Sequence, residues 1–148
     1  MVMMQSAVDN SSFSLSYLGD AWYELWCRHY ILRQCSSARN VHPRVVAMVR
    51  CQTQAEIMRL ILPLLTLDEE LVFKRGKNVK PQTCPRHASV KDYRFATGFE
   101  CLLGYWYVQN NTNRFEELIS HPVVDSFLNQ HLNNVQKSQP EGFNVCSA

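Results

Sequence analysis

Apolar residues recur every three or four positions over most of the chain, the period of an α-helix, and nowhere alternate as in a β-strand. The first such stretch predicts a helix from Ser14 to about Gln34. One stripe of it carries Leu15, Leu18, Trp22, Leu25 and His29. Its other side carries Tyr17, Ala21, Tyr23 and Ile31. We therefore expect this helix to be buried on nearly all sides.

The middle of the chain predicts two further helical regions. The first runs from about residue 41, with Pro43 in its first turn, to Pro63, and we expect a break near Cys51. The second begins at a capping-box pattern, Thr66 followed three residues later by Glu69. We predict that it ends near residue 75, because glycine commonly follows the last turn of a helix and residue 76 is a glycine.

The last third of the chain predicts three helices. Ser89 is a suitable N-cap for a long one, from Val90 to about Gln109. Two shorter helices follow, at 114–120 and, starting with a proline, at 122–135. The predicted fold class is all-α, with one domain over residues 13–135, a polar lead-in at 1–12 and a poorly ordered tail at 136–148.

Composition and cysteine spacing indicate the cellular compartment in which the protein works. Hydrophobic residues make up 46% and charged residues 19% of 148 residues, as in ordinary globular proteins. No apolar run reaches membrane-spanning length, and the first residues lack the pattern of a secretory signal. The six cysteines show no zinc-type spacing, and several lie in apolar helical patterns. We expect a cytoplasmic protein without a membrane partner.

Positive charge is concentrated in one segment. The chain has a formal net charge of +2, but residues 74–94 hold seven basic residues and one acidic residue. Such a concentration is typical of a surface that binds a polyanion. A solvated loop with spare lysines is the alternative interpretation.

Two acidic residues stand out because each lies in an apolar helical run beside a glycine or another small residue. They are Asp20, after Leu18 and Gly19, and Glu100, four residues before Gly104. A carboxylate in such a place is usually paired, protonated or bound to a metal. If the two helices meet, the two carboxylates can share a cation, and Mg²⁺ suits oxygen ligands and phosphate substrates. Alternatively, Asp20 bonds to a helical neighbour and Glu100 pairs with an arginine.

Glu24 follows Asp20 by one helical turn. It could act as a third metal ligand or orient one, and an ion pair with Arg28 is equally compatible with the spacing. The five histidines form no metal-binding pattern, and the chain has no glycine-rich phosphate loop.

Three blocks of sequence together resemble the ribonuclease III family, in particular its short branch, Mini-ribonuclease III. The blocks are Ser16-Tyr17-Leu18-Gly19-Asp20-Ala21; Arg75-Gly76-Lys77-Asn78; and Tyr93-Arg94-Phe95-Ala96-Thr97-Gly98-Phe99-Glu100 followed by Leu103-Gly104-Tyr105. The resemblance extends from about Leu15 to Ile119. It implies a helical nuclease domain that works as a homodimer and cuts double-stranded RNA with Mg²⁺, which Mn²⁺ can replace. It also implies a role in maturing the large-subunit ribosomal RNA precursor.

The same resemblance assigns residue roles. Asp20 and Glu100 match two of the four catalytic carboxylates of the longer enzymes, and Ser16 and Thr97 stand at the other two positions. We expect Asp20 and Glu100 to hold the metal, with Ser16, Glu24 and Thr97 placing waters or ligands around it. We expect the RNA backbone to contact Lys74, Arg75, Lys77, Asn78, Lys80 and Arg86.

Two alternatives remain open at this point. One is a non-catalytic RNA-binding module on the same scaffold, although such a module has no reason to keep both acids. The other is a helical protein–protein adaptor with Tyr105-Trp106-Tyr107 as its interface. The same aromatic residues, with Trp22, Trp26 and Phe99, could instead form the centre of a homodimer interface.

Overall fold

The computed structural model describes residues 10–79 and 86–138. All regular structure in these residues is helical, which confirms the predicted all-α class. The α-helices are α1 (Ser12–Leu32), α2 (Val41–Val49), α3 (Cys51–Ile61), α4 (Leu67–Lys77), α5 (Val90–Val108), α6 (Thr112–Ile119) and α7 (Pro122–Lys137). Two short 3₁₀ turns, η1 (Ala38–Asn40) and η2 (Leu62–Leu64), join some of them.

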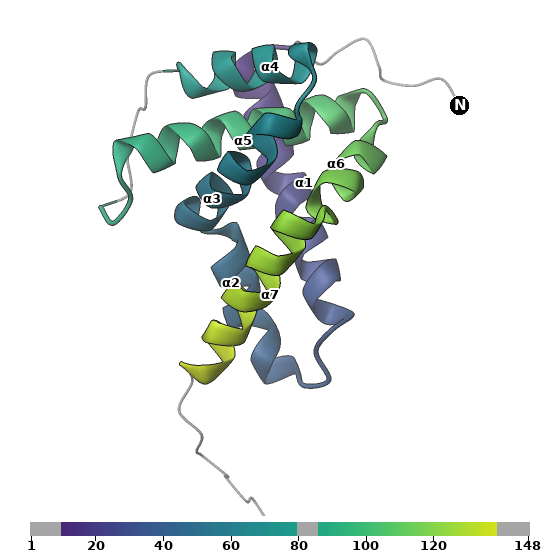
Figure 1. The fold of residues 1–148 in the computed structure, drawn as a ribbon, viewed down its shortest axis with the longest axis vertical. Coiled ribbons are helices and arrows are strands. Elements are labelled where there is room, and N and C mark those ends of the chain that lie inside the picture. The colour runs from purple at the N-terminus through teal and green to yellow at the C-terminus, as the bar shows by residue number, and fades with distance from the viewer. Residues whose placement is uncertain (1–9, 80–85, 139–148) are drawn as a thin grey trace, which may run out of the picture.

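Helices α1 and α5 form the centre of the molecule. They cross each other, and their contact is the most extensive between any two described elements. In Figure 1, α5 runs across the upper half, α4 lies above it and α3 lies in front of it. Helices α2 and α7 extend toward the lower end, and α6 connects α5 to α7. The mid-helix residues of α1 and α5 are therefore enclosed by neighbours from several parts of the chain.

The predicted helix ends are largely confirmed. The Thr66 hydroxyl accepts from the Glu69 amide, and the Glu69 carboxylate accepts from the Thr66 amide, which is the reciprocal bonding of a capping box. Ser89 caps α5 by accepting from the amide of Asp92. The expected break near Cys51 occurs at Arg50, whose extended backbone separates α2 from α3.

The predicted stop at Gly76 is wrong, because α4 continues through it to Lys77. Gly76 is buried against α5, and a Cβ atom there would lie 2.6 Å from the Cys101 sulfur and 3.1 Å from the Gly98 Cα. Glycine at this position therefore serves the close approach of two helices. A local helix-stop signal cannot be distinguished from a packing requirement without knowing the neighbouring helix.

The predicted burial of α1 is also only partly correct. Its buried stripe is Leu15, Gly19, Tyr23, Cys27 and Ile31. Leu25 is 66% exposed, and the flank of the helix that carries Tyr17 is open as well. The helix is therefore amphipathic, with its small residues and one tyrosine turned inward.

Aromatic side chains fill the core between α1, α5 and α6. Phe115 is the hub, with Trp22 and Trp26 edge-on at ring-centre distances of 5.1 and 4.9 Å. Trp106 and Phe99 are almost fully buried beside it. Trp106 and Phe99 therefore stabilise the monomer and offer no surface to a partner. Tyr107, from the same block, is 47% exposed, so the interface stays a prediction for the residues that remain accessible.

A buried ion pair fastens α6 to the start of α4. Glu69 is 5% exposed, and its carboxylate accepts from Arg114 Nε at 2.8 Å and from the Trp106 indole at 3.2 Å. Although burial alone would raise the pKa of Glu69, the Arg114 guanidinium and the other donors lower it below its usual value. This network joins three helices around one charged group.

Two further predictions concern the ends of the chain and the membrane. Helix α7 ends at Lys137, two residues beyond its predicted end, while residues 1–9 and 139–148 lie outside the described part. Across residues 10–79 and 86–138, no helix combines the length and apolar character needed to cross a membrane.

Candidate metal and nucleic-acid site

Two glycines let α1 and α5 approach until their backbones touch. A Cβ atom on Gly19 would lie 1.9 Å from the carbonyl oxygen of Glu100. A Cβ atom on Gly104 would lie 1.9 Å from the carbonyl oxygen of Leu15. No other residue type fits at either position without moving a helix. Because Asp20 directly follows the first glycine, this crossing places its side chain beside the turn that carries Glu100.

The negative charge of Asp20 acts on the Glu100 carboxyl group. Burial raises the pKa of Glu100 to about 8, and the negative charge of Asp20 adds to the rise. The pKa of Asp20 is also raised, first by burial and then by the charge of Glu24. Within the described residues, neither carboxylate takes part in an ion pair. The sequence-based alternative, an arginine partner for Glu100, therefore finds no support.

Gln54 of α3 is a third member of the site that the sequence analysis did not identify. Its side chain is 97% buried by its neighbours, leaving 3% exposed, and its amide nitrogen donates to the Val49 carbonyl at 2.8 Å. Hydrogen bonding from this side chain opposes the rise in the pKa of Glu100. Its carbonyl oxygen is buried without a hydrogen-bond partner. The only sign of Gln54 in the sequence was a polar residue among the apolar positions of a predicted helix.

The three residues expected around the metal differ in the hydrogen bonds and ion pairs that they form within the protein. The Ser16 hydroxyl donates to the Phe13 carbonyl at 3.1 Å, and the Thr97 hydroxyl donates to the Tyr93 carbonyl at 2.9 Å. Both hydroxyl oxygens can still accept a hydrogen bond from water. Glu24 accepts from Arg28 at 2.9 Å, so the alternative of an i, i+4 ion pair is the observed one.

The donor set fits a divalent cation with few protein ligands. Two neighbouring carboxylates that repel each other and lack a cationic partner are stabilised by a bound positive ion. Within the described residues, no group of three or more histidine, cysteine or acidic side chains forms a metal cage. This arrangement suits Mg²⁺, which keeps several waters and completes its shell with substrate oxygens.

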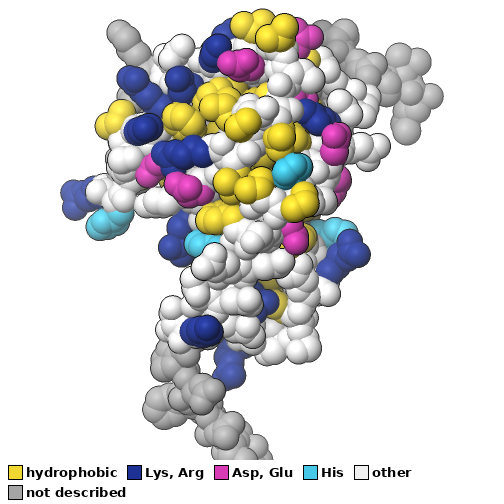
Figure 2. All heavy atoms as spheres, in the orientation of Figure 1, with side chains coloured by type: hydrophobic (Ala, Val, Ile, Leu, Met, Phe, Trp, Pro, Cys, Tyr) yellow, Lys and Arg dark blue, Asp and Glu magenta, His cyan; other side chains and the backbone are white. Residues whose placement is uncertain are grey.

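The predicted basic surface lies where α4 ends and α5 begins. Figure 2 shows Lys and Arg side chains gathered at this end of the molecule, at the upper left. Arg75, Asn78 and Arg86 are exposed there, while Lys74 pairs with Glu70 at 2.9 Å. Lys80 lies outside the described residues.

Not every cation at this end is equally available to a ligand. Lys77 lies over the rings of Phe73 and Phe95, 5.8 Å from each ring centre, and such contacts hold an ammonium group in place. Arg59 is engaged by Asp92 and Glu56 and also lies over Phe95. Arg59 therefore serves the fold, and the exposed cations of α4 and α5 are the ones open to an anion.

Comparison with known proteins agrees with these observations. The Ribonuclease III domain matches residues 14–111. The Mini-ribonuclease 3 of Clostridium tetani is 37% identical over 84% of this chain and 85% of its own length. That of Enterococcus faecalis is 39% identical over 74% and 86%. A crystal structure of protein FN1578 from Fusobacterium nucleatum has a TM-score of 0.73 at 30% identity, covering 83% of this chain and 94% of that one. The chain belongs to the ribonuclease III family of endoribonucleases.

Proposed function

We propose that this endoribonuclease hydrolyses phosphodiester bonds of double-stranded RNA and depends on Mg²⁺, which Mn²⁺ can replace. The observation that carries the proposal is the pairing of Asp20 and Glu100. They are two neighbouring carboxylates with no cationic partner among the described residues, set at a crossing of two helices. The basic surface where α4 ends and α5 begins supports a phosphate-rich substrate.

Each residue of the site has a defined task in this proposal. Asp20 and Glu100 hold the metal directly or through water, and Gln54 steadies Glu100 from the buried side. When bound, the ion supplies an activated water and stabilises negative charge on the phosphate. Ser16 and Thr97 accept hydrogen bonds from metal-bound waters, and Glu24 stays on Arg28 at the edge of the site.

The RNA contacts in this proposal are phosphate contacts. Double-stranded RNA is recognised mainly by shape and by its phosphates and 2′-hydroxyls, so exposed cations are sufficient. Besides Arg75 and Arg86, which form no ion pair with any described residue, the surface comprises Lys74, Lys77, Asn78 and, by sequence, Lys80. Likeness to the Mini-ribonuclease 3 proteins supports a structured natural substrate, and we propose the large-subunit ribosomal RNA precursor, processed in the cytoplasm.

Cleavage assays with defined RNAs test this proposal. We expect the full chain to cut a duplex RNA in the presence of Mg²⁺, to leave the corresponding single strand intact, and to lose all activity when EDTA removes the metal. Binding to the duplex without cleavage at any divalent metal concentration would favour the non-catalytic RNA-binding module instead. Preference for the single strand would contradict the duplex specificity.

A homodimer is also part of the proposal, because two symmetric sites can cut both strands of a duplex. The supporting surface is the open flank of α1, where Phe13 and Tyr17 stack at 5.6 Å and are 73% and 72% exposed. Paired exposed aromatic rings are typical of interface centres. They lie on the helix that carries Asp20, so an interface here would set the two sites at a fixed separation.

Light scattering tests the assembly. We expect a mass of about twice 17.2 kDa for the unmodified chain and a monomer for Tyr17→Glu, because a charge would be buried at the interface. Val123→Glu, which adds the same charge to a 43% exposed position on α7, should remain dimeric. A Tyr17→Glu protein with unchanged mass would move the interface away from this flank.

A further inference from the structure

Positive charge is concentrated in a second segment of the chain besides residues 74–94. Residues 25–55 hold five arginines and no carboxylate, a local balance of +5. This segment covers the second half of α1, all of α2 and the first turns of α3. The lowest part of the face in Figure 2 shows dark-blue side chains, while α7 carries one acidic residue, Asp125, in its first turn.

These five arginines differ in what they bind within the protein. Arg28 pairs with Glu24, and Arg44 donates to the Cys35 sulfur at 3.4 Å. Arg50 is exposed and takes part in no ion pair with any described residue, in contrast to Arg59 and Arg114. Fold stability therefore does not explain the charge of Arg50.

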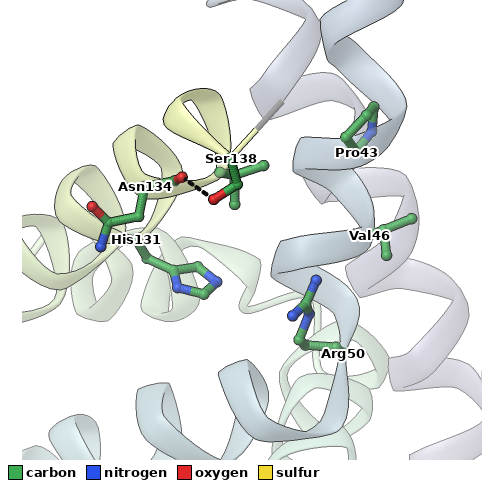
Figure 3. Close-up of a pocket in the computed structure, with 7 residues that line it drawn as sticks. Pro43, Val46, Arg50, His131, Asn134 and Ser138 are labelled. Atoms are coloured by element: carbon green, nitrogen blue, oxygen red, sulfur yellow. Dashed lines mark hydrogen bonds between the residues drawn. The ribbon is translucent and has the colours of Figure 1, made fainter. Parts of the chain in front are cut away.

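Arg50 lines a groove between α2 and α7 with a volume of about 410 Å³. Figure 3 shows its guanidinium and the His131 ring pointing into the space between the two helices. Asn134 and Ser138 line the α7 side, and Pro43 and Val46 line the α2 side. None of the lining residues that the structure describes is acidic, so these residues present one fixed positive charge, neutral polar side chains and an apolar wall.

One end of the groove is anchored to the turn between α2 and α3. The His131 ring nitrogen Nε2 lies 3.1 Å from the Ala47 carbonyl and 3.2 Å from the hydroxyl of Thr53, which is 2% exposed. The ring also stacks on Phe127 at 5.5 Å. These contacts hold α7 against α2 and α3, so the groove has defined walls.

The groove is connected to the carboxylate pair through the first turn of α3. The Gln54 amide donates to the Arg50 carbonyl at 3.1 Å, so one helical turn, about 5.4 Å, separates these residues along α3. The Gln54 side chain in turn neighbours Glu100. Arg50 is therefore one helical turn away from a buried residue that adjoins Glu100.

We propose that the groove between α2 and α7 binds a backbone phosphate of the duplex RNA, with Arg50 as its principal ligand. The guanidinium offers a planar fork that matches phosphate oxygens. The Ser138 hydroxyl already donates to the Asn134 carbonyl at 2.9 Å, so Arg50 is the donor that the groove offers to an anion. In this proposal the RNA contacts the protein at two separate places besides the carboxylate pair: the groove between α2 and α7 and the surface of residues 74–94. This inference rests on the proposed function and adds a contact site to it.

Duplex binding in EDTA, which prevents cleavage, tests the site with the full chain. We expect Arg50→Gln to weaken affinity for a duplex that spans the groove and the carboxylate pair by about tenfold. It should also lower the slope of log affinity against log salt by about one unit. Arg50→Lys should keep most of the slope, because it keeps the charge. Arg33→Gln is the matched control, since it removes the same charge from an exposed position at the end of α1 outside the groove.

The outcomes separate this inference from the proposed function. Equal effects of Arg50→Gln and Arg33→Gln would overturn the phosphate site, because both would then reflect only the loss of one positive charge from the protein. The same holds if Lys77→Gln lowers the slope and Arg50→Gln leaves it unchanged, in which case the proposed function still stands. An unmodified chain that shows no salt-dependent duplex binding would contradict both. Thermal unfolding of each variant confirms that the fold is retained.

Discussion

Asp20→Asn and Glu100→Gln should each reduce duplex RNA cleavage by about a thousandfold or more, because a catalytic metal contributes several kcal/mol to transition-state stabilisation. Each change keeps the size of the side chain and removes the charge that would hold the ion. RNA binding should remain, since the exposed cations are untouched. Single-turnover cleavage rates at saturating Mg²⁺ measure the effect.

Stability measurements distinguish loss of chemistry from loss of fold. Burial and the Asp20 charge raise the pKa of Glu100 to about 8, so the ionised carboxylate is unfavourable in the metal-free protein. A carboxyl group whose pKa is raised in the folded state makes the folded protein less stable as the pH rises. The loss extends from the pKa of the group in the unfolded chain, near 4.5, to its pKa in the folded protein, about 8. Without metal at neutral pH, Glu100→Gln should therefore unfold at the same temperature as the unmodified protein or a higher one.

A matched control and a clear contrary result complete this test. Asp68→Asn makes the same chemical change at an exposed position in the first turn of α4, and its cleavage rate should be unaffected. Near-normal turnover by either Asp20→Asn or Glu100→Gln would show that the pair is not the metal site.

Gly104→Ala should destabilise the protein by about 3 kcal/mol and lower cleavage as well. Its Cβ atom would lie 1.9 Å from the Leu15 carbonyl oxygen, so α1 and α5 would have to separate. The helices carry the two carboxylates, and a shift between them changes the distance that a shared ion bridges. Urea unfolding gives the free energy of unfolding, and cleavage at low temperature gives the activity of the folded fraction.

The control for this variant is Ser126→Ala, which introduces the same residue at an exposed position on α7, where it only removes a hydroxyl group. It should change the free energy of unfolding by less than about 0.5 kcal/mol. If Gly104→Ala proved as stable and active as this control, the close crossing would not determine the geometry of the site.

Local sequence signals predicted the helices well because they act over a single turn. The Thr66–Glu69 capping box, the Ser89 cap and the initial Pro122 all begin helices where expected. The local rule failed at Gly76, which a neighbouring helix requires for packing. It also failed for Trp106 of α5, because the exposure of a ring depends on which helices pack over it, whereas Tyr107 beside it is 47% exposed. Trp106 proved to be 1% exposed inside the core.

The sequence by itself determined the helical class, most helix boundaries, the two acidic residues and the basic segment at 74–94. These depend on residue type and on spacing within one helix, which a linear pattern contains. Only the tertiary structure decided that Gln54 neighbours Glu100 and that Arg50 faces a groove on α7. Both contacts join elements that are far apart in the chain. The distances between these elements follow from how closely α1, α5 and their neighbours pack. That closeness is set by the missing side chains of Gly19 and Gly104.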